Sequence, residues 1–182
     1  VSHDGNRLLY SSKDEKTGND STSLLLNEDG AAPEVVIATP ADELAPCLSP
    51  DGVHLLYLSN VSGHYEVYLA RYPEGTGRRQ VSTGGGAWPR WKGDGSEVYY
   101  VQEDSIMVVE VELGERLLLG PPRGLLYVGP TTHSVTPTGL MSYDVTPDGE
   151  NFLIIRRVEP EAEIVADMRI VRVENWYEEF RK

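Results

Sequence analysis

The stretch Leu48-Ser-Pro-Asp-Gly52 followed by Val53-His-Leu-Leu-Tyr57 decides the fold of this chain. Asp-Gly between apolar runs is the strongest short hairpin signal, because glycine tolerates a positive φ and the aspartate can bond its own backbone. The same setting recurs around Gly5, Gly95 and Gly149. The chain of 182 residues therefore contains four repeats, each marked by one tight turn.

The spacing of the four turns indicates the kind of repeat. Successive turn glycines are about 43 to 54 residues apart, close to the roughly 40–50 residues of a four-stranded propeller blade. In the second repeat we expect strands over residues 46–49, 53–59, 65–71 and 79–82. Their apolar runs are too short for helices and are bounded by Gly, Ser, Asn and Pro. Neighbouring blades would have to cover both faces of such strands.

The other repeats follow the same plan but are incomplete at the two ends of the chain. In the third and fourth repeats the expected strands are 89–91, 96–102, 105–111, 123–128, 142–146, 151–158 and 168–173. The fourth repeat lacks an outer strand, and Val1 and Ser2 are all that remains of the inner strand of the first. The tail Asn175–Lys182 starts on a good helix cap and spaces its aromatic residues as in a short helical segment.

These patterns predict an all-β fold of β-propeller blades, about four tandem four-stranded antiparallel sheets with the terminal ones incomplete, and a short C-terminal helical segment. We expect a single, partial propeller domain whose blades cover approximately 1–40, 45–83, 88–128 and 141–182. A closed four-bladed ring and the pairing of two half-rings would both cover the exposed edges.

Composition removes several classes of partner. With 29 acidic and 16 basic residues the net charge is −13, which disfavours nucleic acid and anionic membranes. A content of 40% apolar residues is typical of a folded chain, and no apolar run approaches the roughly 18 residues needed to cross a bilayer. The single Cys47 excludes an internal disulfide and a cysteine-built zinc site. Because the chain begins at Val1 without a leader, we expect a piece of a longer polypeptide, and its compartment stays open.

The line from Ser49-Pro-Asp-Gly52 through Tyr65-Glu-Val-Tyr68, Gln80-Val-Ser-Thr83 and Trp88-Pro-Arg-Trp91 resembles two consecutive blades of the TolB-type, WD-like β-propeller repeat family. The ending, from Tyr143-Asp-Val-Thr-Pro-Asp-Gly149 to Asn175-Trp-Tyr-Glu-Glu179, is similar to the C-terminus of propellers that follow bacterial Ser/Thr kinase or regulator domains. The resemblance implies a propeller, usually of six or more blades, used for binding or sensing. Such propellers are sometimes periplasmic and sometimes act as a gate in front of a peptidase.

Residue types that could carry catalysis or hold a cofactor form no recognisable site in the sequence. The four turn aspartates fall in different blades, far apart around a ring, and the four histidines lack a ligand spacing such as His-x-x-x-His. Gly84-Gly-Gly86 resembles a phosphate cradle only superficially, because no Gly-Lys-Ser/Thr follows, and we expect a loop between blades. We therefore predict no catalytic residue, no metal and no cofactor, and a packing role for Cys47.

The loops at the entry to each inner strand are where we expect ligand contact. Trp88 precedes a proline at such an entry, and an exposed indole beside Arg90 is the kind of anchor that interaction hot spots use. Blade packing is the alternative for these residues. Tyr143 and His133 hold the analogous approach to the fourth blade, and Glu43 holds that to the second.

The leading hypothesis is a non-enzymatic binding or sensing module of a larger TolB-like propeller protein, with a protein, a peptide or a small ligand as partner. The alternative is an accessory propeller that gates substrates for a peptidase of the prolyl-oligopeptidase type. A third hypothesis is that an incomplete ring has no function on its own. The open blade edges also predict a homodimer, because unpaired strand groups are a template for association.

Overall fold

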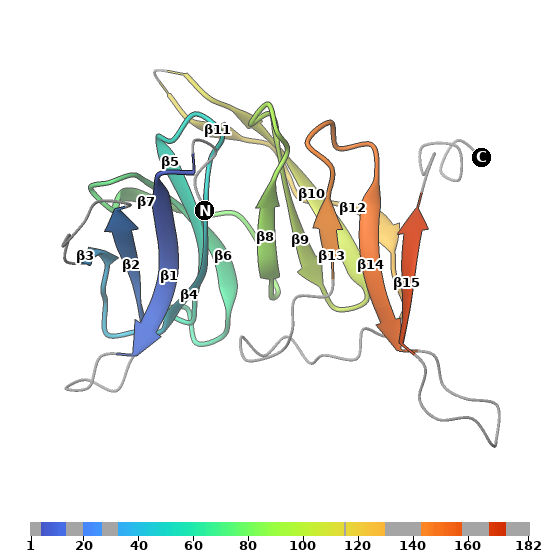
Figure 1. Cartoon of the computed structure of the whole chain (residues 1–182), viewed down its shortest axis with the longest axis horizontal. Coiled ribbons are helices and arrows are strands. Elements are labelled where there is room, and N and C mark those ends of the chain that lie inside the picture. The colour runs from blue at the N-terminus through green and yellow to red at the C-terminus, as the bar shows by residue number, and fades with distance from the viewer. Residues whose placement is uncertain are drawn as a thin grey trace.

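A computed structural model describes residues 5–13, 20–26, 33–114, 116–129, 143–157 and 168–173 of the chain. In these residues the strands form four sheets, and the paired strands within each sheet are antiparallel. Each sheet uses one continuous part of the chain. Figure 1 shows the sheets following one another across the molecule, from the blue N-terminal sheet to the red C-terminal one.

The four sheets take up their strands in chain order. The first contains β1 (Arg7–Lys13), β2 (Asp20–Leu26) and β3 (Glu34–Ile37). The second contains β4 (Glu43–Leu48), β5 (His54–Ser59), β6 (Glu66–Arg71) and β7 (Thr76–Gln80). The third contains β8 (Ala87–Trp91), β9 (Glu97–Gln102), β10 (Ser105–Glu112), β11 (Leu118–Leu119) and β12 (Arg123–Tyr127), the last two both pairing with β10. The fourth contains β13 (Tyr143–Val145), β14 (Phe152–Arg157) and β15 (Met168–Val173).

This arrangement confirms the predicted all-β fold of tandem propeller blades. The expected helical segment at 175–182 lies outside the described residues. Within the described part of the chain, no helix has the length and apolarity that a membrane span requires.

The turn that marks each repeat has the same internal bonds in the second, third and fourth sheets. Gly52, Gly95 and Gly149 all have a φ between +72° and +77°, which L side chains rarely adopt. The amide of each of these glycines donates to the carbonyl three residues earlier, at 2.8–2.9 Å. The Oδ1 of each turn aspartate accepts from the amide two residues later, at 2.9–3.0 Å. The repeats seen in the sequence are therefore structural repeats.

The core of the molecule lies between the sheets. Along β5, Leu55 and Tyr57 pack toward the first sheet, whereas Leu56 and Leu58 pack toward the third. Because successive side chains of a strand point to opposite faces, one apolar run supplies two interfaces. The strands β9 and β10 divide their residues in the same way between the second and fourth sheets. Each of the three interfaces between neighbouring sheets thus has its own apolar cluster.

Four strands differ from the expected ones. We expected the outer strand of the second sheet at 79–82, but β7 begins three residues earlier and exposes all five of its residues, so no apolar pattern marks its position. The inner strands β4 and β8 begin at Glu43 and Ala87, before the expected 46 and 89. The short β11 lies in the stretch we interpreted as a long connection.

Replacing Leu56 with alanine tests the two-sided core. Leu56 is fully buried between the second and third sheets, so Leu56→Ala should lower the free energy of unfolding by about 2–5 kcal/mol. The control is Leu118→Ala on β11, where the side chain is exposed and the change should stay within about 0.5 kcal/mol. Urea unfolding followed by tryptophan fluorescence measures both. Equal effects of the two substitutions would contradict the described core.

Candidate functional site

Three consecutive inner strands carry an equivalent position four residues before the turn aspartate. The residues at this position are Cys47 on β4, Arg90 on β8 and Asp144 on β13. Each pairs with the residue four positions after the turn glycine: Cys47 with Leu56, Arg90 with Tyr99 and Asp144 with Leu153. Leu56 and Tyr99 are buried against the next sheet along the chain, whereas Leu153 is exposed. Paired residues share a face of the sheet, so Cys47 and Arg90 lie on the side toward the next sheet, and Asp144 lies on the same face as the exposed Leu153.

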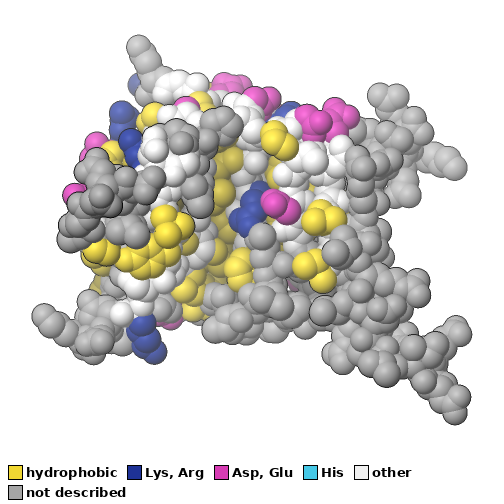
Figure 2. Space-filling model, viewed as in Figure 1, with side chains coloured by type: hydrophobic (Ala, Val, Ile, Leu, Met, Phe, Trp, Pro, Cys, Tyr) yellow, Lys and Arg dark blue, Asp and Glu magenta, His cyan; other side chains and the backbone are white. Residues whose placement is uncertain are grey.

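Polar contacts at this position join the third and fourth sheets. Arg90 Nε lies 3.3 Å from Asp144 Oδ1, and Arg90 Nη1 donates to the carbonyl of Pro89 at 2.8 Å. One residue before Asp144 and two before Arg90, the hydroxyl of Tyr143 donates to the carbonyl of Trp88 at 2.9 Å. The face shown in Figure 2 has a basic and an acidic group side by side near its centre, in the region that Figure 1 places between β8 and β13.

A groove of about 520 Å³ runs along these inner strands and the turns that follow them. Its lining comes from the second, third and fourth sheets: Cys47, Leu48, Ser49, Pro50, Arg90, Trp91, Gly93, Asp94, Val145, Pro147 and Asp148. The wall is fixed by bonds between sheets. Trp91 Nε1 donates to the carbonyl of Cys47 at 3.2 Å, and the amide of Gly93 donates to the carbonyl of Pro147 at 2.8 Å.

The groove carries ionised carboxylates and one guanidinium. The Ser96 hydroxyl and amide hold the pKa of Asp94 below its ordinary value, and the Thr146 hydroxyl and the Glu150 amide do the same for Asp148. Burial raises the pKa of the Cys47 thiol, although the charge of Arg90 partly opposes this shift. A protonated thiol is a poor nucleophile.

The predicted contact residues separate into two groups. Trp88, Arg90 and Tyr143 come together where β8 meets β13. Trp88 has a positive φ of 54° and packs partly buried against the clusters on both sides of the third sheet. Glu43 is fully buried on β4, and His133 lies outside the described residues.

The surroundings of Glu43 are those of a structural carboxylate. It accepts hydrogen bonds from the amide of Thr39 at 3.1 Å and from the hydroxyl of Ser59 at 3.3 Å. These bonds join β4, its preceding loop and β5. Contact of Glu43 with a ligand stays a prediction.

Sequence reasoning missed Asp144 and the place of Cys47 in the groove. The signal that could have found them is their fixed offset from the Asp-Gly turn, which makes them equivalent to Arg90. The β-bulges of β4 and β8, where Ala45 and Trp88 take a positive φ, were not predictable from residue type. Among the described residues, no group of three His, Cys, Asp or Glu side chains could hold a metal ion.

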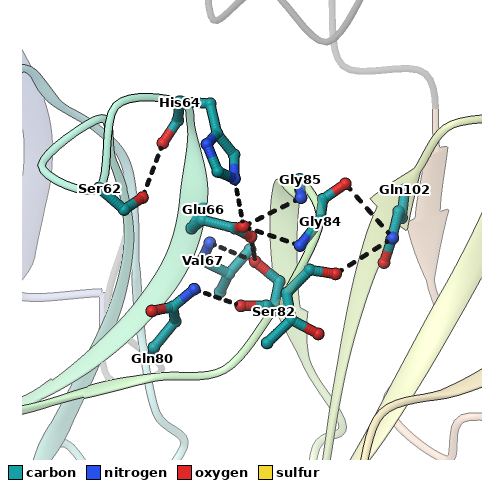
Figure 3. Close-up of polar contacts among 10 residues, drawn as sticks. Ser62, His64, Glu66, Val67, Gln80, Ser82, Gly84, Gly85 and Gln102 are labelled. Atoms are coloured by element: carbon teal, nitrogen blue, oxygen red, sulfur yellow. Dashed lines mark hydrogen bonds and ion pairs between the residues drawn. The ribbon is translucent and has the colours of Figure 1, made fainter.

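A second polar cluster surrounds Glu66 at the start of β6 (Figure 3). This carboxylate is 1% exposed and accepts from His64 Nε2 at 2.7 Å and from the amides of Gly84 and Gly85 at 2.9 and 3.0 Å. The Ser82 hydroxyl also donates to it and in turn accepts from the amide of Val67 at 2.8 Å. The cluster ties β6 to the glycine-rich loop that leads into the third sheet.

These bonds determine the pKa of Glu66 and the hydrogen-bond partners of the loop amides. Burial works to raise the pKa of Glu66, but the hydrogen bonds from Ser82, Gly85, His64 and Gly84 outweigh it and hold the pKa below its ordinary value. Gly84 and Gly85 already donate their amides to a carboxylate, which leaves no cradle for a phosphate. The stretch is a connection between blades, as expected.

The fold and the groove define a class of protein: consecutive β-propeller blades whose inner strands line a shared groove. No protein-family model and no curated protein matches the sequence. Solved structures do match. The chain is similar to TolB from Acinetobacter baumannii, with a TM-score of 0.62 and 18% identity over 94% of this chain and 39% of that one.

Two further structures are enzymes. A puromycin-hydrolyzing peptidase from Mycobacterium tuberculosis gives a TM-score of 0.61 and 18% identity over 96% of this chain and 29% of the peptidase. An oligogalacturonate lyase from Vibrio parahaemolyticus gives 0.55 and 15% over 93% and 44%. The structural neighbours are therefore TolB and related propeller peptidases and lyases, and the chain spans less than half the length of these three proteins.

Replacing Glu66 tests the cluster at the start of β6. At neutral pH, Glu66→Gln should lower the free energy of unfolding by about 1–3 kcal/mol, because buried donors lose a charged acceptor. A carboxylate with a lowered pKa stabilises the fold above its unfolded pKa and loses this effect as the pH falls through its folded pKa. The difference from the wild type should therefore shrink as the pH falls below the ordinary value of 4.5. Urea unfolding across the acid range measures it.

The matched control for this prediction is Glu112→Gln, at an exposed position on β10. It removes the same charge without removing a buried acceptor, so we expect a change within about 0.5 kcal/mol at every pH. A Glu66→Gln effect that stayed constant from neutral to acid pH would contradict the assignment of an ionised, hydrogen-bonded Glu66.

Proposed function

We propose that this chain is a non-catalytic binding module that takes a protein or peptide segment in the groove along its inner strands. The observation that carries the proposal is the groove itself, because three sheets contribute equivalent positions of their inner strands to one concave surface. Strands held between packed neighbours form a rigid platform, and such platforms usually carry binding sites at their ends and loops.

The charges in the groove favour a basic segment. Asp94 and Asp148 are exposed, and their lowered pKa values keep them ionised well into the acid range. Two basic groups lie at the groove: Arg90 in its lining pairs with Asp144, and Lys92 beside the lining lies 3.9 Å from Asp94 Oδ2. The net charge of −13 adds a long-range attraction for cations. A lysine or arginine side chain of a partner would therefore be attracted electrostatically to the turn end of the groove.

Gating of substrates for a peptidase is the second role to consider. It is supported by the likeness to the propeller of a peptidase, and this likeness is one of fold alone at 18% identity. In that role the same groove would contact peptides on their way to a hydrolase supplied elsewhere. Selection of a basic segment by Asp94 and Asp148 would hold in both cases.

Panning a random library of linear peptides on the immobilised chain tests the proposal. We expect the selected peptides to carry lysine or arginine and to lose at least about tenfold in affinity toward an Asp94→Asn, Asp148→Asn double variant. Asparagine keeps the preference for the turn, so the fold should survive. Isothermal titration calorimetry at low salt provides the affinities.

The control variant for the peptides carries Glu110→Gln and Glu112→Gln, two exposed positions on β10 outside the groove lining. It removes the same total charge. Peptides that bound both variants with equal affinity would show that the binding depends on net charge alone, and would overturn the groove as the site.

A further inference from the structure

Arg90 has hydrogen-bond donors that are available at the groove. Its Nε lies 3.3 Å from Asp144 Oδ1, and its Nη1 donates to the carbonyl of Pro89 at 2.8 Å. A guanidinium has five N–H donors, and among the described residues these contacts use two of them. The side chain is 23% exposed and belongs to the lining of the groove. Arg90 can therefore donate to a further acceptor that enters the groove.

The arrangement of these donors favours a carboxylate. A planar guanidinium binds a carboxylate through two parallel N–H···O bonds, and such charge-assisted bonds are stronger than bonds to a neutral oxygen. Asp144 makes a single contact with Arg90, through the same Oδ1 that accepts from the amide of Val145 at 3.0 Å. Asp144 does not belong to the lining of the groove, so its contact leaves the groove side of Arg90 accessible. A ligand carboxylate can form the forked contact there.

The acidic end of the groove lies at a short, fixed distance from this guanidinium. The amide of Gly93 donates to the carbonyl of Pro147 at 2.8 Å, so the turns that carry Asp94 and Asp148 lie next to each other. A rise of about 3.3 Å per residue over the three residues from Arg90 to Gly93 places these turns roughly 10 Å from Arg90. One groove thus presents a positive and a negative pole about three residues of extended chain apart.

The turn end stays negative although Lys92 lies beside it. Lys92 Nζ is 3.9 Å from Asp94 Oδ2 and 3.6 Å from Glu97 Oε2. Its single charge is shared between these two carboxylates, and it also acts on Asp148. One lysine does not neutralise three carboxylates, so the turn end still attracts a cation.

The charge of the whole chain limits which carboxylate ligands can use Arg90. At −13 the chain repels a ligand that is only acidic. A segment that joins one carboxylate to one lysine or arginine has no net charge, and each of its charges meets the opposite charge in the groove. Entry in the reverse direction would place like charges together. The two poles therefore select both the composition and the direction of a bound segment.

We propose that the groove is specific for a peptide segment with a basic side chain and a carboxylate two to four residues apart, and that Arg90 binds the carboxylate. This inference rests on the proposed function, because it adds a second charged contact in the same groove to the one at Asp94 and Asp148. The basic side chain lies at the turns, and the carboxylate lies at β8. An acidic side chain and the C-terminus of a segment both supply this carboxylate, since Arg90 recognises the same group in each.

Fluorescence polarisation with defined peptides at low salt tests this inference. Each probe is a short, C-terminally amidated, rhodamine-labelled peptide of serine and alanine that carries one lysine and one glutamate at a chosen separation. We expect the tightest binding at separations of two to four residues, where replacing the glutamate with glutamine should weaken it at least about fivefold. A second set has no glutamate and ends in a free carboxylate at the same separations from the lysine. Comparing the two sets identifies which source of the carboxylate the groove prefers.

Variants of the chain separate a ligand contact from a structural role. In Arg90→Gln, the glutamate and glutamine peptides should bind equally, while the contribution of the lysine is kept. In Asp144→Asn, the glutamate peptide should bind about fivefold tighter than in the wild type, because a like charge beside the ligand carboxylate is removed. A purely structural bridge between the third and fourth sheets would give no such gain.

The control variant is Arg79→Gln, at an exposed position on β7 outside the groove lining. It removes the same charge as Arg90→Gln and should keep the preference for glutamate. Circular dichroism verifies that each variant is folded. If Arg90→Gln is unfolded, the gain in Asp144→Asn decides alone.

Failure of this inference is distinguishable from failure of the proposed function. Peptides that bind through lysine, with equal affinity for the glutamate and glutamine forms, overturn the role of Arg90 and leave the binding module intact. If no peptide of either set binds, the groove itself is overturned as the site. A preference for glutamate that survives in Arg90→Gln, or that is equal at every separation, assigns the carboxylate to another basic group and also overturns the inference.

Discussion

Burial on both faces is the constraint on which this structure depends. A central strand such as β5 sends Leu55 and Tyr57 to one side and Leu56 and Leu58 to the other, so neither face of the sheet can meet water. The sheet alone would expose both sets of residues, and its stability comes from neighbours of the same kind. The repeated turn, with its glycine at positive φ, begins the second strand of each repeat at the same point. Equivalent residues of successive sheets therefore point to equivalent faces.

Buried carboxylates hold two of the loops between strands. Glu43 bonds the loop before β4, and Glu66 bonds the glycine-rich loop before β8. The amides of such loops have no ladder partners, and a carboxylate can satisfy several of them at once. These bonds hold the starts of β4 and β8, the inner strands that carry Cys47 and Arg90. The groove forms because inner strands and turns of successive repeats lie next to one another.

Much of the fold could be predicted from the sequence, because turn chemistry and short apolar runs are local signals. The strands around Gly52 and Gly95 lie within a few residues of their expected positions. The exposed strand β7 and the bulges at Ala45 and Trp88 depend on pairing with neighbours and leave no mark in residue type. The site was predicted only in part for the same reason. Trp88, Arg90 and Tyr143 were chosen for their places at strand entries in two different repeats. Their contacts, like the pairing of Arg90 with Asp144, depend on how two sheets meet.

The resistance of a sheet to local opening also depends on its place in the row. Amides of β5, β6, β9 and β10 belong to sheets that are covered on both sides, whereas those of β1 and β14 belong to sheets with one neighbour in the described part of the chain. Where stability is a sum of contacts between nearest neighbours, unfolding starts at the termini and moves inward. Hydrogen exchange should therefore be slowest in the middle of the row, which makes the central pair of sheets the kinetic anchor of the molecule.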